Sequence, residues 1–187
     1  MIKLQDENPN LLMHICCAPC ATYPVELLKD RFNIDLLFYN PCIYPKEELL
    51  KRMDTASLFA EKMDLRLKFL NADEKSFLNK AQGLESCSEG GLRCAQCFQQ
   101  RLQKAAEFAK SQKADLFTTT LTISPHKDSS TILNMGKMVE KNLPGTSLKF
   151  LDIDFKQDNG FQKSIELSRN LGLYRQNYCG CRFSVKK

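Results

Sequence analysis

The sequence predicts an α/β domain built on a parallel β-sheet that is flanked by helices. Short apolar runs, each long enough for one buried strand, alternate with longer segments whose apolar residues recur at helical spacing. The chain has 187 residues, 43% of them hydrophobic and 26% charged, which is the length and composition of one ordinary globular domain. Such alternation is typical of parallel strands joined by right-handed crossovers.

Each predicted element follows from this pattern. The apolar runs predict strands at residues 11–15, 34–39, 65–70, 115–123 and 148–155. The amphipathic segments predict helices at residues 24–30, 45–63, 94–111, 129–141 and 161–171. Pro24 and Pro45 suit a first helical turn, and Gly172 closes the last helix. Since no repeat or linker divides the chain, residues 1–187 are expected to form one domain with its site at the carboxyl ends of the strands.

Several classes of protein find little support in the sequence. No apolar run approaches the roughly 20 residues of a membrane helix, and the polar N-terminus, with Asp6 and Glu7, does not resemble a targeting peptide. We therefore expect a cytoplasmic protein without a membrane partner. Neither a GxGxxG nor a GxxxxGK(S/T) pattern occurs, and Pro19 removes a backbone donor after the first strand. ATP or NAD binding is accordingly not predicted.

The positive charge is concentrated near the C-terminus. The chain has 27 Lys and Arg against 22 Asp and Glu, a formal net charge of +5. Residues 160–187, which we call the basic C-terminal segment, hold six of the basic residues and only Glu166 among the acidic ones, and so carry the whole excess. Such a segment suggests a polyanionic partner such as nucleic acid. A solvated helix with a charged tail explains the composition equally well.

The cysteines require an explanation of their own. Nine in 187 residues is roughly 5%, below the roughly 8–10% of a disulfide scaffold, and the number is odd. We therefore expect reduced thiols. They fall into a loop group after the first strand, a pair at a helix start, a pair near the end and two singletons without assigned chemistry: Cys16, Cys17 and Cys20; Cys94 and Cys97; Cys179 and Cys181; Cys42 and Cys87.

The spacing of these thiols points to metal chemistry. Cys94 and Cys97 lie on one face of a helical turn, at a helix start that favours thiolate. Together with two loop cysteines they could bind Zn²⁺ or an iron–sulfur cluster, while buried or merely reactive thiols remain a third interpretation. The adjacent pair Cys16 and Cys17 is unusual for a zinc ribbon and favours the cluster.

A glycine separates the last two cysteines. A disulfide between Cys179 and Cys181 would close a very small, strained ring, which indicates a redox-active pair more than a structural crosslink. Binding of a metal by the same two thiols is the competing interpretation.

Four ordered motifs carry a family resemblance that spans nearly the entire chain. They are residues 14–20 (HICCAPC), 92–97 (LRCAQC) followed by Arg101, 118–128 (TTTLTISPHKD) and 174–181 (YRQNYCGC). Together they resemble the QueH family of epoxyqueuosine reductases. The resemblance implies the last step of queuosine biosynthesis, in which the epoxide on the modified wobble guanine of tRNA is reduced to a cyclopentene. It also implies a cobalamin-independent enzyme with a [4Fe-4S] cluster and a fold similar to the adenine nucleotide alpha hydrolases (HUP).

The resemblance also assigns residues. It implies that Cys16, Cys17, Cys94 and Cys97 hold the cluster and that Cys179 and Cys181 form a redox-active pair. A second, single iron is implied as well, with Cys20, Cys179 and Cys181 as its candidate ligands. The implied partners are tRNA containing epoxyqueuosine in its anticodon loop and an electron donor that the sequence does not identify.

Other polar residues near these motifs are candidates for proton transfer. His126, Lys127 and Asp128 follow a predicted strand and could deliver a proton or orient the substrate. Helix capping by Ser124 or Asp128, with solvated charges beside it, accounts for the same residues. His14, inside the first strand, is expected to be a hydrogen-bonded core histidine.

The tRNA is expected to meet basic and aromatic side chains. The candidates for phosphate contacts are Arg175, Arg182, Lys186 and Lys187, with Arg93 and Arg101 near the cluster. Tyr174 and Tyr178 could stack an extruded base, or could serve as core tyrosines. Two rival functions use the same residues: a non-catalytic zinc module that binds RNA, and a thiol–disulfide oxidoreductase working through Cys179 and Cys181.

Overall fold

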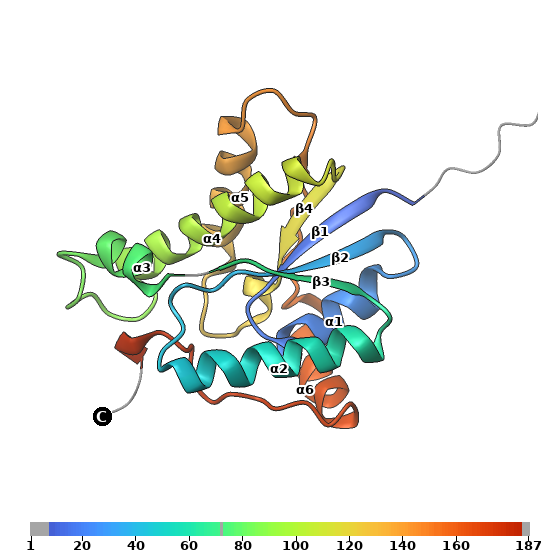
Figure 1. The fold of residues 1–187 in the computed structure, drawn as a ribbon, viewed down its shortest axis with the longest axis horizontal. Helices are drawn as coiled ribbons and strands as arrows, with labels where there is room; N and C mark the ends of the chain where they lie inside the picture. The colour runs from blue at the N-terminus through green and yellow to red at the C-terminus, as the bar shows by residue number, and fades with distance from the viewer. Residues whose placement is uncertain (1–7, 72, 185–187) are drawn as a thin grey trace, which may run out of the picture.

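The computed structural model describes residues 8–71 and 73–184 and contains a five-stranded, wholly parallel sheet between two layers of helices (Figure 1). The α/β prediction is thereby confirmed. In spatial order the strands are β3 (Arg66–Phe69), β2 (Asn33–Phe38), β1 (Asn10–Ile15), β4 (Leu116–Thr119) and β5 (Lys149–Phe150).

The helices cover the two faces of this sheet. On one face α4 (Leu92–Ser111) packs against β1 and β4 and against α5 (Ser129–Asn142), as Figure 1 shows. On the other face lie α1 (Ala18–Leu28), α2 (Lys46–Lys62) and α6 (Gly160–Asn170), and α1 packs on both of its neighbours. The short α3 (Glu74–Ala81) packs against α4. Among the described residues, no helix is long and apolar enough to cross a membrane.

The central strand β1 positions the site. It is buried from Leu11 onward and lies between β2 and β4, so that Met13 is opposite both Leu36 and Thr118. The chain winds from β1 outward to β2 and β3 and then returns to β4 on the other side. The loops after β1 and β4 therefore diverge, which is where α/β sheets of this kind form their ligand sites.

The first helix begins earlier than the sequence pattern predicts. The predicted start at Pro24 is wrong, because Pro19 occupies the first turn of α1 and Pro24 lies inside the helix. As a result Cys20 is on the helix and not in a loop. The helix α3 was not predicted; Asp73 caps it by accepting a hydrogen bond from the backbone nitrogen of Lys75 at 3.0 Å.

Two predicted strands are shorter than their apolar runs. The run at residues 115–123 forms β4 and then the 3-10 helix η1 (Thr120–Ile123), which begins where the Thr119 hydroxyl accepts a hydrogen bond from the backbone nitrogen of Leu121. The run at residues 148–155 pairs with β4 over only two residues. Two further 3-10 helices are present among the described residues. The first, η2 (Gln157–Asn159), directly precedes α6, and the second, η3 (Arg182–Ser184), follows Cys181.

The chain after α6 returns to the carboxyl ends of the strands. Cys181 forms an isolated antiparallel bridge with Ile43, just before α2, and Arg182 makes an ion pair with Glu74 of α3 at 2.7 Å. Figure 1 shows this final segment beside the start of α2. The terminal cysteines are thereby brought to the same end of the sheet as the loop after β1.

Candidate thiol-lined active site

The loop after β1 contains three buried thiols. The sulfurs of Cys16, Cys17 and Cys20 all lie within 4.8 Å of one another, and those of Cys16 and Cys17 are 4.0 Å apart. Cys17 is the N-cap residue of α1 and Cys20 lies in its first turn. The start of the helix therefore brings the three thiols close to one another. We call these residues the loop triad.

Polar neighbours fix the loop triad from two sides. The Thr120 hydroxyl, directly after β4, accepts a hydrogen bond from the backbone nitrogen of Cys16 at 3.3 Å and lies 3.7 Å from its sulfur. The side-chain amide of Gln176 donates to the sulfur of Cys17 at 2.9 Å. The neighbouring thiols of Cys17 and Cys20 lower the pKa of Cys16, while burial raises that of Cys17 to about 12. Cys16 is therefore the most acidic thiol of the triad.

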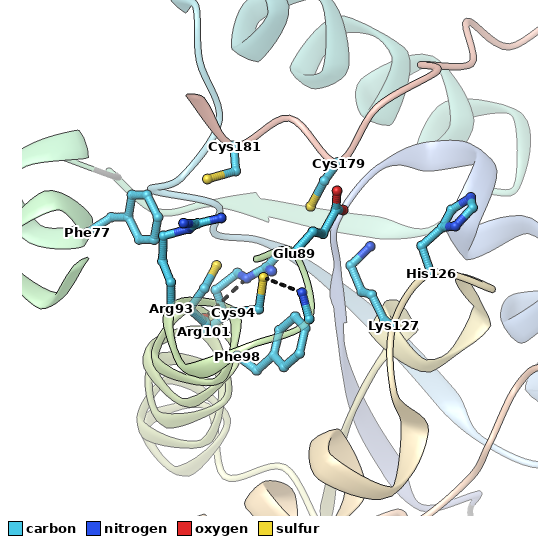
Figure 2. A pocket seen from close by; sticks show the side chains of 12 residues that line it. Phe77, Glu89, Arg93, Cys94, Phe98, Arg101, His126, Lys127, Cys179 and Cys181 are labelled. Carbon is cyan, nitrogen blue, oxygen red and sulfur yellow. Dashed lines mark hydrogen bonds between the residues drawn. The ribbon is translucent and has the colours of Figure 1, made fainter. Parts of the chain in front are cut away.

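A second set of thiols lines a pocket (Figure 2). Cys94 and Cys97 lie on the first turns of α4, and the sulfur of Cys94 accepts a hydrogen bond from the backbone nitrogen of Gly90 at 3.3 Å. Cys179 and Cys181 belong to the C-terminal segment, and Figure 2 shows their sulfurs pointing toward the pocket. We call this the thiol pocket.

Cys42 reaches the same region although the sequence pattern assigns it no role. It is buried, and its thiol neighbours that of Cys97. This contact lowers the pKa of Cys42 to about 6 and raises that of Cys97. Cys42 is therefore the more acidic thiol of the two.

Two cations face the thiols. Arg101 is 3% exposed and lines the thiol pocket; its Nη1 donates to Asn40 Oδ1 at 3.2 Å, while its buried Nη2 has no partner among the described residues. Burial alone would lower the pKa of Lys127, yet the charges of Cys179, Cys16 and Cys20 outweigh burial and raise it. Both side chains therefore stay positively charged against groups that are able to carry negative charge.

The family of this chain follows from its similarity to known proteins. A family model described as epoxyqueuosine reductase QueH matches residues 11–187. The epoxyqueuosine reductase QueH of Streptococcus pyogenes serotype M1 is 40% identical over 185 residues, which cover 96% of this chain and 71% of that protein. The chain belongs to the QueH family. The QueH protein of Thermotoga maritima is 33% identical over 181 residues, covering 94% of this chain and 90% of its own.

Solved structures resemble this QueH chain in fold alone. The U34-tRNA thiolase NcsA from Methanococcus maripaludis, solved with its [4Fe-4S] cluster, has a TM-score of 0.58 at 13% identity, covering 95% of this chain and 61% of that one. A predicted subunit of a tRNA methyltransferase from Methanocaldococcus jannaschii has a TM-score of 0.52 at 16% identity, covering 83% and 75%. These neighbours confirm the HUP-like fold that the QueH resemblance implies.

The structure distributes the predicted cluster ligands over both thiol groups. Cys16 and Cys17 lie in the loop triad together with Cys20, whereas Cys94 and Cys97 line the thiol pocket together with Cys179 and Cys181. Arg101 links the groups, since its positive charge acts on the pKa values of Cys16 and Cys97. All nine cysteines are free thiols, and Cys87 lies in neither group.

The three residues suggested for proton transfer have different surroundings in this QueH chain. Lys127 and His126 line the thiol pocket. Asp128 is exposed and caps α5, accepting hydrogen bonds from the backbone nitrogen of Thr131 at 2.8 Å and from neighbouring hydroxyls. These bonds lower the pKa of Asp128 to about 2, so this carboxylate holds no proton to deliver near neutral pH.

His14 is a core histidine, as the sequence predicts. It is fully buried, with its Nδ1 2.9 Å from the Thr119 hydroxyl and its Nε2 3.1 Å from the carbonyl oxygen of Tyr39. Burial and the charge of Arg101 lower the pKa of His14 to about 4. It is neutral and links β1, β4 and the end of β2.

The predicted RNA-binding arginines divide into buried and accessible ones. Arg93 is 4% exposed and donates to the carbonyl oxygens of Leu84, Glu85 and Cys87, so it orders the loop before α4. Arg101 is buried at the thiol pocket. Both side chains line the thiol pocket, so a contact with a phosphate on the outer surface stays a prediction.

Arg175 and Arg182 are the accessible members of the set. Arg175 is half-buried over the ring of Phe161, and Arg182 is exposed over the ring of Tyr44. Lys186 and Lys187 lie outside the described residues. Arg175 and Arg182 are therefore the accessible guanidinium groups of the set, and that of Arg182 is already ion-paired with Glu74.

The two tyrosines suggested for base stacking are half-buried. The hydroxyl of Tyr174 donates to Glu48 Oε2 at 2.8 Å, and that of Tyr178 donates to the carbonyl oxygen of Tyr44 at 2.9 Å. Lys51 lies over the ring of Tyr174, and Arg52 over the ring of Tyr178. Each ring is thus anchored by its hydroxyl and has a cation on one face.

Sequence reasoning missed several polar residues around the site. Glu48 and Arg52 form a buried ion pair on α2 at 2.7 Å, and Asn40 connects Arg101 to the carbonyl oxygen of Ile15. The spacing of four residues between Glu48 and Arg52 could have indicated the pair. Nothing in the local sequence indicates that it is buried beside the C-terminal cysteines.

Proposed function

We propose that this QueH-family chain reduces the epoxide of epoxyqueuosine in tRNA with a thiolate-bound [4Fe-4S] cluster. Epoxyqueuosine reduction, the final step of queuosine biosynthesis, is the activity of the family to which the chain belongs. The observation that carries the cluster proposal is the gathering of seven cysteines in the loop triad and the thiol pocket, beside the buried Arg101 and the half-buried Lys127.

The donor set fits such a cluster. Thiolate sulfur is the ligand that iron–sulfur clusters and zinc prefer, and neither group offers a carboxylate-rich site typical of harder ions. We propose Cys16, Cys17, Cys94 and Cys97 as the cluster ligands, with Cys20, Cys179 and Cys181 left to bind a second iron. When bound, a cluster supplies electrons one at a time. NcsA carries a [4Fe-4S] cluster on a similar fold.

The side chains of Arg101 and Lys127 suit a site that accumulates negative charge. Thiolates and a departing oxygen are anionic, and a buried anion is costly unless a cation lies close by. The guanidinium of Arg101 retains an unpaired donor, Nη2, at the thiol pocket, and Lys127 presents an ammonium there. These two side chains are the proposed electrostatic partners of the bound substrate.

Removal of an epoxide oxygen as water consumes two electrons and two protons. Lys127 is the proposed proton donor, because it lines the thiol pocket and its thiol neighbours keep it protonated. His126 lies beside it in the pocket lining and is accessible to solvent, so it is placed to return the proton. Asp128 caps α5 and is thereby proposed to fix the position of Lys127, the residue before it.

The tRNA is proposed to bind along the basic C-terminal segment. Arg175 and Arg182 provide accessible guanidinium groups on the segment that carries Cys179 and Cys181, and a phosphate at Arg182 would compete with Glu74. Phosphate contacts there would position the anticodon loop, and Tyr174 and Tyr178 would stack an extruded base.

Anaerobic reconstitution tests the metal centre. Purified protein is loaded with iron and sulfide, and its iron, sulfide and zinc contents are measured together with its visible absorption. We expect a brown protein with equal iron and sulfide from the cluster and additional iron from the second site. Cys94→Ser should lose the cluster, whereas the matched control Cys87→Ser should retain it. A colourless protein with stoichiometric zinc would contradict the proposal.

A further inference from the structure

A buried arginine of α2 contacts the backbone next to the terminal cysteine pair. Arg52 is 2% exposed, and its Nη1 donates to the carbonyl oxygen of Cys179 at 3.0 Å. Its Nη2 donates to the carbonyl oxygen of Tyr178 at 3.3 Å. One rigid guanidinium therefore contacts two consecutive peptide groups immediately before Gly180.

The orientation of this guanidinium is itself fixed. Arg52 Nε donates to Glu48 Oε1 at 2.7 Å, and Glu48 Oε2 accepts a hydrogen bond from the hydroxyl of Tyr174 at 2.8 Å. Tyr174 lies at the start of the segment that ends in Cys181. The buried pair therefore connects both ends of residues 174–181 to α2, and each charge has a hydrogen-bonded partner.

Gly180 fits against the same side chain. A Cβ atom at this position would lie 2.7 Å from both Nη1 and Nη2 of Arg52, and the φ angle of Gly180 is +99°. The carbonyl oxygen of Gly180 accepts a hydrogen bond from the backbone nitrogen of Tyr44 at 2.7 Å. The glycine between the two cysteines thus allows the backbone to approach the guanidinium closely.

We propose that Arg52 is a positioning residue that holds Cys179 and Cys181 at the thiol pocket. The proposal rests on the proposed function of that pocket. Without the guanidinium, the carbonyl groups of Tyr178 and Cys179 lose their buried donors, and the segment moves toward water to regain hydrogen bonds. Lysine is a poor substitute, since its single ammonium cannot reproduce the planar fork that reaches Glu48 and two carbonyls.

Alkylation of individual thiols tests the proposal without requiring turnover. Reduced apo-protein is treated anaerobically with iodoacetamide, and the rate at each cysteine is followed by peptide mass spectrometry. In Arg52→Gln we expect the rates at Cys179 and Cys181 to rise at least about tenfold, the factor that matches the loss of one hydrogen bond to a charged group. The rate at Cys97 should stay at the wild-type value.

Matched variants separate positioning from general destabilisation. Lys62→Gln removes an exposed charge from the same helix and should leave every rate unchanged. Tyr174→Phe removes one hydrogen bond from Glu48 and should raise the rates at Cys179 and Cys181 less than Arg52→Gln does. If Arg52→Gln does not fold, Arg52→Lys and Tyr174→Phe supply the same comparison.

Two results would overturn the proposal. The first is an unchanged rate at both terminal cysteines, and the second is an equal rise at all buried thiols, which would indicate global loosening. In active enzyme we also expect kcat to fall while KM for tRNA is retained; a raised KM with an intact kcat would instead assign Arg52 to RNA binding. Failure of the wild-type protein to bind iron would refute the proposed cluster and leave the alkylation result standing.

Discussion

Substitution of Gly180 by alanine tests how closely the terminal cysteine segment packs on Arg52. The new Cβ would lie 2.7 Å from both terminal nitrogens of the guanidinium, whereas ordinary contact begins at 3.4 Å. Arg52 cannot move away freely, because it is 2% exposed and its other side is hydrogen-bonded to Glu48. Either the guanidinium or the segment must therefore shift, and their mutual hydrogen bonds lengthen.

The loss in free energy of unfolding caused by Gly180→Ala has two parts. A non-glycine residue at positive φ costs about 1–2 kcal/mol. Loss of one hydrogen bond to a charged group adds about 1.5–3 kcal/mol, so the total is about 2.5–5 kcal/mol. Gly83 provides a matched control, since its φ is +77° but a Cβ added there would have no atom within 4 Å. Gly83→Ala should cost only the backbone part, about 1–2 kcal/mol.

Urea unfolding of the reduced apo-protein measures both values. The free energy of unfolding should fall more in Gly180→Ala than in Gly83→Ala, by the hydrogen-bond part of the cost. In an Arg52→Ala background the clash is absent, so Gly180→Ala should then cost no more than the control. Equal costs for the two glycine variants in the wild-type background would refute the reasoning.

Three further predictions concern the site and the core. Lys127→Met should lower kcat about 10²- to 10⁴-fold in single-turnover assays with little change in tRNA affinity; an unchanged rate would remove Lys127 from proton transfer. Arg182→Gln should weaken tRNA binding and reduce the slope of log affinity against log salt by about 1, and a slope equal to that of wild type would exclude a phosphate contact. Gly136→Ala places a Cβ well inside contact distance of the ring of Phe150, which packs on Phe117 with ring centroids 5.0 Å apart. Overpacking of about 1–3 kcal/mol should exceed the roughly 1 kcal/mol that alanine adds to helix propensity, so thermal unfolding should occur at lower temperature; a stabilised variant would show that the ring has room to move.

The sheet could be predicted because buried parallel strands need continuous apolar runs. The run that ends at Ile15 corresponds closely to β1. The same rule predicts too long a strand at residues 115–123, because an apolar run indicates burial and not backbone geometry. Residues Thr120–Ile123 are buried, yet the Thr119 hydroxyl turns them into a 3-10 helix.

The site could be predicted only where it is local in sequence. Cys94 and Cys97 share a helical face because of their spacing, and the structure keeps them together at the thiol pocket. The contact between Cys42 and Cys97 and the contact between Arg52 and Cys179 join distant segments. These contacts depend on how α2, α4 and the C-terminal segment pack, which no local pattern encodes.

The central claim is that the thiols of the loop triad and the thiol pocket serve epoxide reduction. The most direct measurement is an anaerobic assay in which iron-loaded protein and a chemical reductant act on tRNA containing epoxyqueuosine, with the nucleosides analysed by mass spectrometry. We expect queuosine to form with wild-type protein and with Cys87→Ser, and not with Cys97→Ser. Absence of queuosine from fully loaded wild-type protein, or its formation at the wild-type rate by Cys97→Ser, would contradict the account.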